Sequence, residues 1–320
     1  MNEFELIKNY FSVLSSYNKH SLSLNDDVFF DKSKGLVVSV DAYIEGIHFL
    51  NFDKPDLVIK KLLRSSISDI ICKGVYPKYY FISAAGDKKK FSTLNLKKIS
   101  KSLNQEQKKY NISLSGGDTV FSKKLSFSIT TIGYSKSIIF RNKAKLNDDI
   151  YVTGNLGDSF IGLKILKNQT SFNKSLNKYF INKYYHPDIN IKFTKKLYKC
   201  ANTSIDISDG LFADLDKLIN KQNLSYKLNL KKIPVSKNLE KLLRTKKKLN
   251  KLSVISQGDD FQILFTAPIS KARIINKISK SIGLKISKIG KICNNNQKSS
   301  IIDEKGNKKR LNYKGYIHKF

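Results

Sequence analysis

Six short acidic segments constrain this chain more than any other feature. The sequence has 26 Asp and Glu against 59 Lys and Arg, yet the scarce acids recur in patterned places that interrupt or end apolar runs. These segments are Asn25-Asp26-Asp27, Val38 to Asp41, Ser68-Asp69, Gly116 to Thr119, Asp206 to Gly210 and Gly258 to Asp260. Burying an unpaired carboxylate is costly, so each acid needs a partner. We therefore expect these side chains to converge as oxygen ligands for a hard cation such as Mg²⁺.

The length and composition predict a folded protein of two domains. The chain has 320 residues, of which 40% are hydrophobic, and no apolar run reaches the ~18 residues of a membrane span. The N-terminal residues lack the pattern of a signal peptide. The three cysteines, Cys72, Cys200 and Cys293, are far apart, which argues against a disulfide framework or a zinc site. We expect a cytoplasmic protein.

The formal charge of +33 raises the alternative of a basic RNA-binding protein. Nearly all of this charge comes from lysine, however, because arginine occurs only at positions 64, 141, 244, 273 and 310. Specific phosphate and base recognition favours the bidentate arginine fork. We interpret the lysine runs as solvated surface and keep RNA binding as the alternative of a different class.

Apolar periodicity predicts strands and helices in both halves of the chain. The predicted helices are 3–17, 56–73, 92–110, a helix from Asp158 onward, and 211–220. The predicted strands are 28–30, 35–41, 78–84, 112–114, 125–134, 150–153, 203–207 and 263–266. The apolar pattern breaks near 135–147, which suggests domains of residues 1–140 and 141–320. Strands and helices interleave without a regular βαβ repeat, so the predicted class is α+β.

Three motifs have both a functional and a structural interpretation. Gly116-Gly117-Asp118-Thr119 follows one predicted strand and precedes another, so it suits either phosphate approach or an ordinary hairpin turn, and alone it favours the turn. Asp158, after Gly154-x-x-Gly157, is expected to cap a helix. Asp209 is another candidate cap, which leaves Asp206 unexplained. The sequence contains no GxxxxGK[ST], no GxGxxG that opens a helix and no HRD motif, so any nucleotide chemistry needs another phosphate apparatus.

Taken in order, the segments resemble the thiamine-monophosphate kinase family, which belongs to the superfamily of aminoimidazole ribonucleotide synthetase and selenophosphate synthetase. The matching stretches are NDDVFF, VVSVDAYIEGIHF, SDIICKGVYP, LSGGDT, RNKAKLNDDIYVTGNLGDS, IDISDGLFADL, SQGDDFQILFT and YKGYIH. The resemblance implies an N-terminal α/β domain that dimerises into a central β-barrel and a C-terminal α+β domain. It also implies ATP-dependent phosphorylation of thiamine monophosphate to thiamine diphosphate by a cytoplasmic homodimer, with several Mg²⁺ ions, K⁺ as a further candidate, and neither a nucleic-acid nor a membrane partner.

The resemblance also implies a set of site residues. The implied metal ligands are Asp27, Ser39, Val40, Asp41, Asp69, Asp118, Asp206 and Asp209, with Val40 able to contribute only its carbonyl. The implied ATP contacts are Tyr110, Gly117, Asp118, Arg141 and Ser208, and the implied contacts to thiamine monophosphate are His48, Asp259 and Tyr316. No catalytic residue distinct from the metal ligands is implied. The chain departs from the family pattern at Val40, often Thr, at Asn25 and Gln257, usually Gly, and at Asp259, where Glu is common.

The residues agree with this chemistry. A phosphate acceptor is already anionic at pH 7, so no general base is needed, and the obstacle is repulsion between two polyanions. Several cations held by many carboxylates would remove that obstacle. Another ATP-using synthetase of the same superfamily is the nearer alternative. Selenophosphate synthetase usually carries a reactive Cys or selenocysteine near an N-terminal Gly-rich segment, whereas no Cys precedes Cys72 here.

Overall fold

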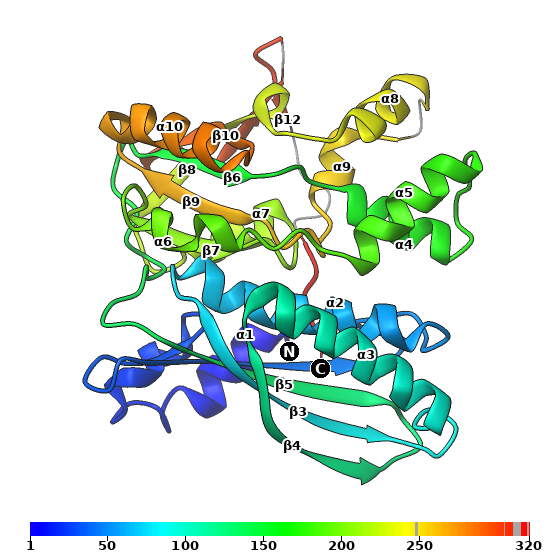
Figure 1. Cartoon of the computed structure of the whole chain (residues 1–320). Helices are drawn as coiled ribbons and strands as arrows, with labels where there is room; N and C mark the ends of the chain where they lie inside the picture. The colour runs from blue at the N-terminus through cyan, green and yellow to red at the C-terminus, as the bar shows by residue number, and fades with distance from the viewer. Residues whose placement is uncertain (247–248, 304, 310–314, 319) are drawn as a thin grey trace.

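The computed structural model of the chain describes residues 1–246, 249–303, 305–309, 315–318 and 320. The chain forms two halves, each built on its own β-sheet, and this confirms the predicted α+β class (Figure 1). Tyr313 and Lys314 of the C-terminal YKGYIH segment lie outside the described residues. The two ends of the chain meet, since the N-terminal ammonium of Met1 donates to the Phe320 carbonyl at 3.1 Å.

The N-terminal sheet has the order β1-β2-β5-β3-β4. Strands β3 and β4 pair in parallel, and the other neighbours pair antiparallel. The strands are β1 Phe29–Asp31, β2 Leu36–Ile44, β3 Pro77–Gly86, β4 Ser113–Phe121 and β5 Ser126–Tyr134.

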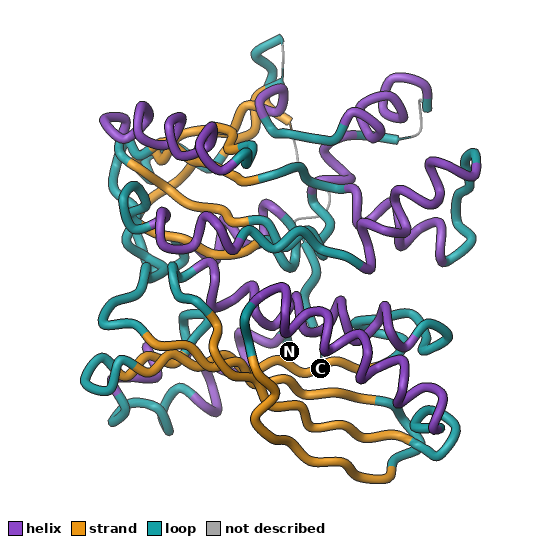
Figure 2. The backbone as a smooth tube through the Cα atoms, viewed as in Figure 1, coloured by secondary structure: helices purple, strands orange, loops and turns teal. Residues whose placement is uncertain are grey.

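One face of this sheet is covered and the other is open. Along β5, buried Phe127, Ile129 and Thr131 alternate with half-buried neighbours, as expected for a strand whose side chains alternate between faces. Helices α2 (Pro55–Cys72) and α3 (Thr93–Tyr110) lie over the buried face, between the sheet and the other half of the chain (Figures 1 and 2). Every residue of β4 is exposed.

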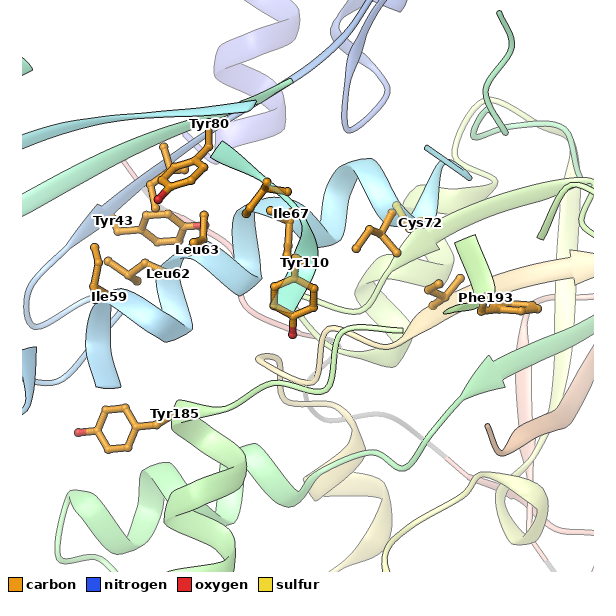
Figure 3. Close-up of a cluster of buried hydrophobic side chains, with 14 of the residues drawn as sticks. Tyr43, Ile59, Leu62, Leu63, Ile67, Cys72, Tyr80, Tyr110, Tyr185 and Phe193 are labelled. Carbon is orange, nitrogen blue, oxygen red and sulfur yellow. The ribbon is translucent and has the colours of Figure 1, made fainter. Parts of the chain in front are cut away.

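Helix α2 is buried nearly all round, which is unusual for a helix of a globular domain. It begins at Pro55 and packs Ile59, Leu62, Leu63 and Ile67 against neighbours on both sides (Figure 3). One side faces the sheet, and the C-terminal end of the helix faces the second half of the chain. The small side chains that the sequence places late in α2 therefore lie between the two halves.

The C-terminal sheet has the order β12-β11-β8-β10-β6-β9-β7. Only β11 and β8 pair in parallel among its described strands. Its strands are β6 Asp149–Thr153, β7 Thr203–Asp206, β8 Leu224–Asn229, β9 Ile263–Ala267, β10 Ile286–Asn294, β11 Ser300–Ile302 and β12 Lys308–Lys309. Its helices are α4 Asp158–Leu166, α5 Lys174–Tyr185, α6 Thr194–Leu197, α7 Leu211–Leu218, α8 Lys237–Thr245, α9 Lys251–Ile255 and α10 Ala272–Ile282.

Most predicted elements are confirmed to within a few residues, and four predictions are wrong. The helix predicted over 3–17 is only α1 Glu3–Leu6 followed by a π-helical turn, Ile7–Phe11. The Gly116 to Thr119 motif is not a turn but lies inside β4. Asp158 is the first residue of α4 rather than its cap, which is Gly157. Asp209 does not cap α7 either, because the cap is Gly210 without a side-chain bond. No described helix has the length and apolar character needed to cross a membrane.

Candidate active site

Four of the predicted carboxylates meet at the junction of the two halves. Asp27 precedes β1, Asp41 lies in β2, Asp69 lies in α2, and Asp206 ends β7. The negative charges of Asp41, Asp206 and Asp27 each raise the pKa of Asp69, after the larger effect of burial. The sheet, the central helix and the second half of the chain thus each contribute an acid to one cluster.

Asp41 has an unsatisfied carboxylate oxygen. Its Oδ2 is buried and makes no hydrogen bond of good geometry with any described residue. Burial raises the pKa of Asp41 to about 6, against the opposing influence of Tyr43 and Ser66. A buried acceptor of this kind is costly unless a cation or a donor completes it.

Asp69 and Asp206 each receive one serine hydroxyl. Ser39 donates to Asp69 Oδ2 at 2.6 Å, and Ser68 donates to Asp206 Oδ2 at 2.7 Å. These bonds do not balance the charge, because burial and neighbouring carboxylates hold the pKa of Asp69 and of Asp206 well above the ordinary value. Ionising these two acids therefore requires a counter-charge that the described residues do not supply.

Asp27 is in the opposite electrostatic situation. The ammonium of Lys73 lies 2.5 Å from Asp27 Oδ2 and 2.7 Å from Asp26 Oδ1, and an Arg141 guanidinium nitrogen lies 3.7 Å from Asp27 Oδ1. Burial alone would raise the pKa of Asp27, but Arg141 and Lys73 outweigh it and lower the pKa. Asp26 also accepts the backbone N–H of Arg141 at 2.9 Å, which fixes the linker after β5 against this site.

The loop after β7 brings Ser208 and Asp209 to the edge of the cluster. The Asp209 carboxylate pairs with Lys217, which also contacts Asp214 at 3.0 Å. The Ser208 carbonyl accepts the N–H of Asp259 at 2.8 Å. A Cβ on Gly258 would lie 1.9 Å from that carbonyl oxygen, so only glycine allows these two loops to approach.

The three predicted substrate contacts lie in one region and are joined by two other residues. His48 and His318 have ring centroids 5.3 Å apart, and the Tyr316 hydroxyl lies 3.4 Å from His318 Nδ1. Asp259 pairs with Lys61 of α2 at 2.9 Å. Asp259 raises the pKa of His48, although burial and the charges of His318 and Lys61 lower it overall.

The tautomer of His48 follows from its hydrogen bond. The backbone N–H of Ile44 donates to His48 Nδ1 at 3.0 Å, so Nδ1 is an acceptor. The neutral ring therefore carries its hydrogen on Nε2. This nitrogen is the one left to donate to a ligand.

The remaining predicted residues do not join the carboxylate cluster within one chain. Gly117 and Asp118 lie on the exposed strand β4. Val40 is 65% exposed. Tyr110 is buried in the hydrophobic core, with its ring 5.8 Å from the Arg64 guanidinium, which forms a bidentate pair with Glu106.

The cluster is chemically suited to a cation. Asp41, Asp69 and Asp206 offer hard oxygen donors without a paired cation, the donor set that Mg²⁺ prefers. Among the described residues, no three acidic, His or Cys side chains already form a ligand group. The Ser39 and Ser68 hydroxyls occupy one oxygen of Asp69 and of Asp206, respectively, which leaves the other oxygen of each carboxylate for a cation.

A pocket borders the substrate region. It has a volume of about 320 Å³ and is lined by residues of the C-terminal half, with Lys109 from α3. Asp188 and Asp259 lie in its wall together with buried Asp158 and Asp260, so its carboxyl groups outnumber its two lysines, Lys109 and Lys183.

Several residues of the site were not predicted from the sequence. Lys73 follows the apolar stripe of α2 directly before Gly74, a position that normally indicates a solvated lysine at a helix end. Lys61 lies on the same helix beside Lys60. Nothing in the sequence indicates that only one of these two lysines is buried. His318 is separated from His48 by most of the chain, so no spacing rule connects them.

Comparison with known proteins agrees with this geometry. Residues 25–135 match the AIR synthase related protein N-terminal domain. The chain is 33% identical to the thiamine-monophosphate kinase of Buchnera aphidicola from Acyrthosiphon pisum over 327 residues, covering 99% of this chain and 98% of that one. It is 29% identical to the Escherichia coli thiamine-monophosphate kinase, with the same coverage.

The solved structures give the same result. The structure of AaThiL complexed with AMPPCP and TMP superimposes with a TM-score of 0.85 at 27% identity, covering 99% of this chain and 97% of that one. The crystal structure of thiamine monophosphate kinase from Aquifex aeolicus gives a TM-score of 0.81 at 26% identity, covering 97% and 98% of the two chains. The chain belongs to the thiamine-monophosphate kinase family.

Proposed function

We propose that this chain transfers the γ-phosphoryl group of ATP to thiamine monophosphate and so produces thiamine diphosphate. The observation that carries the proposal is the buried cluster of Asp41, Asp69 and Asp206, for which the described residues provide no paired cation. A relative named thiamine-monophosphate kinase, 33% identical over almost the whole chain, supports the same substrate pair.

The cluster explains how a reaction between two anions would proceed. Asp41, Asp69 and Asp206, with Asp209 at the edge, would hold Mg²⁺, whereas Asp27 contacts Lys73. Bound there, Mg²⁺ supplies charge neutralisation between donor and acceptor phosphates. The buried Arg141 Nε makes no hydrogen bond with a described residue, so it is free to donate to a phosphate oxygen. The acceptor phosphate needs no general base, in agreement with the absence of a nucleophile and base pair from the predicted site.

The substrate residues divide into two chemical groups. His48 Nε2 and the Tyr316 hydroxyl are donors suited to the phosphate or the aminopyrimidine of thiamine monophosphate. Asp259 and Asp188 line an acidic pocket suited to the cationic thiazolium ring. We propose that Lys61 holds Asp259 in place, because the ammonium is buried between that carboxylate and the Tyr184 ring, 3.7 Å from its centroid.

We further propose a homodimer in which the open faces of two N-terminal sheets pair. The open face carries Val40, Val120 and Tyr134, each at least half exposed. Such an apolar face on a long, exposed edge strand favours pairing with a second copy. Asp118 lies on the same strand, so we propose that it contributes to the site of the partner subunit.

We also propose two domains, residues 1–140 and 141–320, a cytoplasmic location, and ATP contacts from Tyr110, Gly117 and Ser208. K⁺ is a candidate second ion. It would bind away from Asp26 and Asp27, which contact Lys73.

The direct test is product formation. Purified protein is incubated with ATP and thiamine monophosphate, with Mg²⁺ or with EDTA, and thiamine diphosphate is measured by chromatography. We expect product only with Mg²⁺. If ATP is consumed without thiamine diphosphate, another synthetase activity of the superfamily replaces this proposal. A steep salt dependence of RNA binding, without turnover, would instead favour the RNA-binding alternative.

A further inference from the structure

We propose that the Lys73 ammonium is a tethered monovalent cation that permanently occupies a cation position of this site. The Asp26 and Asp27 side of the cluster then needs no free ion. This inference takes the identity of the reaction from the proposed function. The geometry that supports it does not depend on that function.

Three oxygens from two separate segments surround Lys73 Nζ. They are Asp26 Oδ1 at 2.7 Å, Asp27 Oδ2 at 2.5 Å and the backbone carbonyl of Ser204 at 2.9 Å. Two carboxylates and a carbonyl form the kind of oxygen set that hard cations take in proteins. An ammonium group is a compact point charge of about the size of K⁺, so it can occupy the same position.

The lysine cannot leave this position at low cost. Its side chain has no exposed surface, and a fully buried lysine is rare unless it is paired. Lys73 is the C-cap residue of α2, where the partial negative charge of the helix end favours a cation. The Ser204 hydroxyl donates to the Cys72 carbonyl beside it, which holds β7 against the end of α2.

The cation divides the cluster into two electrostatic parts. Near Lys73 and Arg141 the pKa of Asp27 is lowered, whereas Asp41, Asp69 and Asp206 have raised pKa values. Ionising the acids on the side away from Lys73 therefore needs a further cation. A divalent ion is recruited there, while Asp26 and Asp27 fix the linker and Arg141.

The test is chemical rescue of Lys73→Ala. Its melting temperature is compared in ammonium chloride and in tetramethylammonium chloride at equal ionic strength, and bound Mn²⁺ is counted by electron paramagnetic resonance without nucleotide. We expect the variant to melt several degrees higher in ammonium than in tetramethylammonium. In tetramethylammonium it should bind an additional Mn²⁺, which ammonium displaces. The wild type should give the same melting temperature and the same Mn²⁺ count in both salts.

Lys60→Ala is the matched control, since Lys60 lies on the same helix and pairs with Glu106 at 3.8 Å, outside the cluster. It should show neither rescue nor additional Mn²⁺. Equal behaviour of Lys73→Ala in the two salts, with an unchanged Mn²⁺ count, overturns the inference. If Lys73→Ala does not fold, the wild type is tested instead. A requirement for K⁺ or ammonium in Mn²⁺ binding by the wild type would show that Lys73 does not fill the cation position. None of these measurements uses thiamine monophosphate. Their outcome therefore does not depend on whether the chain phosphorylates thiamine monophosphate, and the two failures can be distinguished.

Discussion

At the scale of single residues, the partners of each carboxylate decide its role. Asp27 and Asp209 contact lysines, whereas Asp41, Asp69 and Asp206 do not pair with a cation among the described residues. Asp26 and Asp27 are adjacent in sequence and share one lysine. An acid that is buried without a counter-charge lowers the stability of the fold, and this is characteristic of functional sites.

Asp206→Asn should therefore separate stability from activity. The amide keeps an acceptor for Ser68 but removes a buried charge, so we expect the melting temperature in metal-free buffer to rise by about 2–4 °C. Turnover with ATP and thiamine monophosphate should fall by about 100-fold or more, because charge compensation at the phosphates is lost. The melting curve and the product assay measure the two effects.

The exposed Asp53→Asn provides the control, and it should change neither quantity. A destabilised Asp206→Asn protein with full turnover would contradict the assignment of this acid to the cation site.

Asp260 predicts a pH dependence of stability. Both of its carboxylate oxygens accept the N–H of Gly157, at 3.0 and 2.8 Å, and burial raises its pKa well above the ordinary value. The folded state then binds more protons than the unfolded state, so stability falls as pH rises from about 4, the unfolded pKa, through the raised folded pKa. Asp260→Asn should lose this dependence. Its advantage in melting temperature over the wild type should grow between pH 4 and pH 8, and a constant difference across that range would refute the explanation.

At the scale of elements, helix α2 and two loops assemble the site. Helix α2 carries Lys61, Ser68, Asp69 and, at its cap, Lys73 toward partners in three different elements. The loops after β7 and before β9 touch through their backbones. Asp259 and Phe261 have positive φ values of 68° and 50°, which side chains other than glycine rarely adopt. This strained loop places Asp259 beside Lys61.

Gly258→Ala should disturb that loop contact. The new Cβ would meet the Ser208 carbonyl oxygen at 1.9 Å, so the loops must separate. We expect a loss of about 2–4 kcal/mol in the free energy of unfolding and a fall in kcat/KM for thiamine monophosphate. Denaturant unfolding and steady-state kinetics measure the two changes.

Gly283→Ala is the matched control. Gly283 has a φ of +65° but nothing lies within 4 Å of its Cβ position, so only the cost of the left-handed conformation, about 1 kcal/mol, applies. Its kcat/KM should be unchanged. Equal kinetic effects at both glycines would mean that the contact between the loops does not position Asp259.

At the scale of the whole molecule, the unpartnered face of the N-terminal sheet predicts an active site shared between two copies. Mixing Asp118→Asn and Asp69→Asn subunits after denaturation and refolding tests this. If Asp118 acts on the partner's site, each mixed dimer keeps one intact site, and random mixing restores about a quarter of wild-type activity.

If Asp118 acts within its own chain, every site in the mixture is defective and activity stays at the level of the separate variants. Val120→Glu offers a second measurement. It places a charge on the same apolar face and should shift the protein toward the monomer in analytical ultracentrifugation, without altering the far-UV circular dichroism spectrum. A protein that remains dimeric would exclude this face as the interface.

Local pattern predicted much of the fold. Helices 56–73 and 92–110 and the strands around Asp41 and Asp206 were predicted from apolar periodicity, which responds to burial of one face or stripe. The helix over 3–17 was predicted wrongly because the stripe through Phe4, Phe11 and Leu14 is apolar but stays exposed, so no tertiary packing extends the helix. Gly116 and Gly117 indicated a turn, whereas pairing with β3 holds them in a strand.

The sequence by itself indicated which acids need a partner, since most of the carboxylates at the ends of apolar runs are buried, although Asp118 is exposed on β4. It also determined the class of fold and the family. Only the tertiary structure decided how those acids are partnered, because Lys73, Lys61 and His318 reach the site across long sequence separations. A lysine after an amphipathic helix looks the same in sequence whether it faces water or two carboxylates, and only the packing of α2 between the two halves distinguishes the two cases.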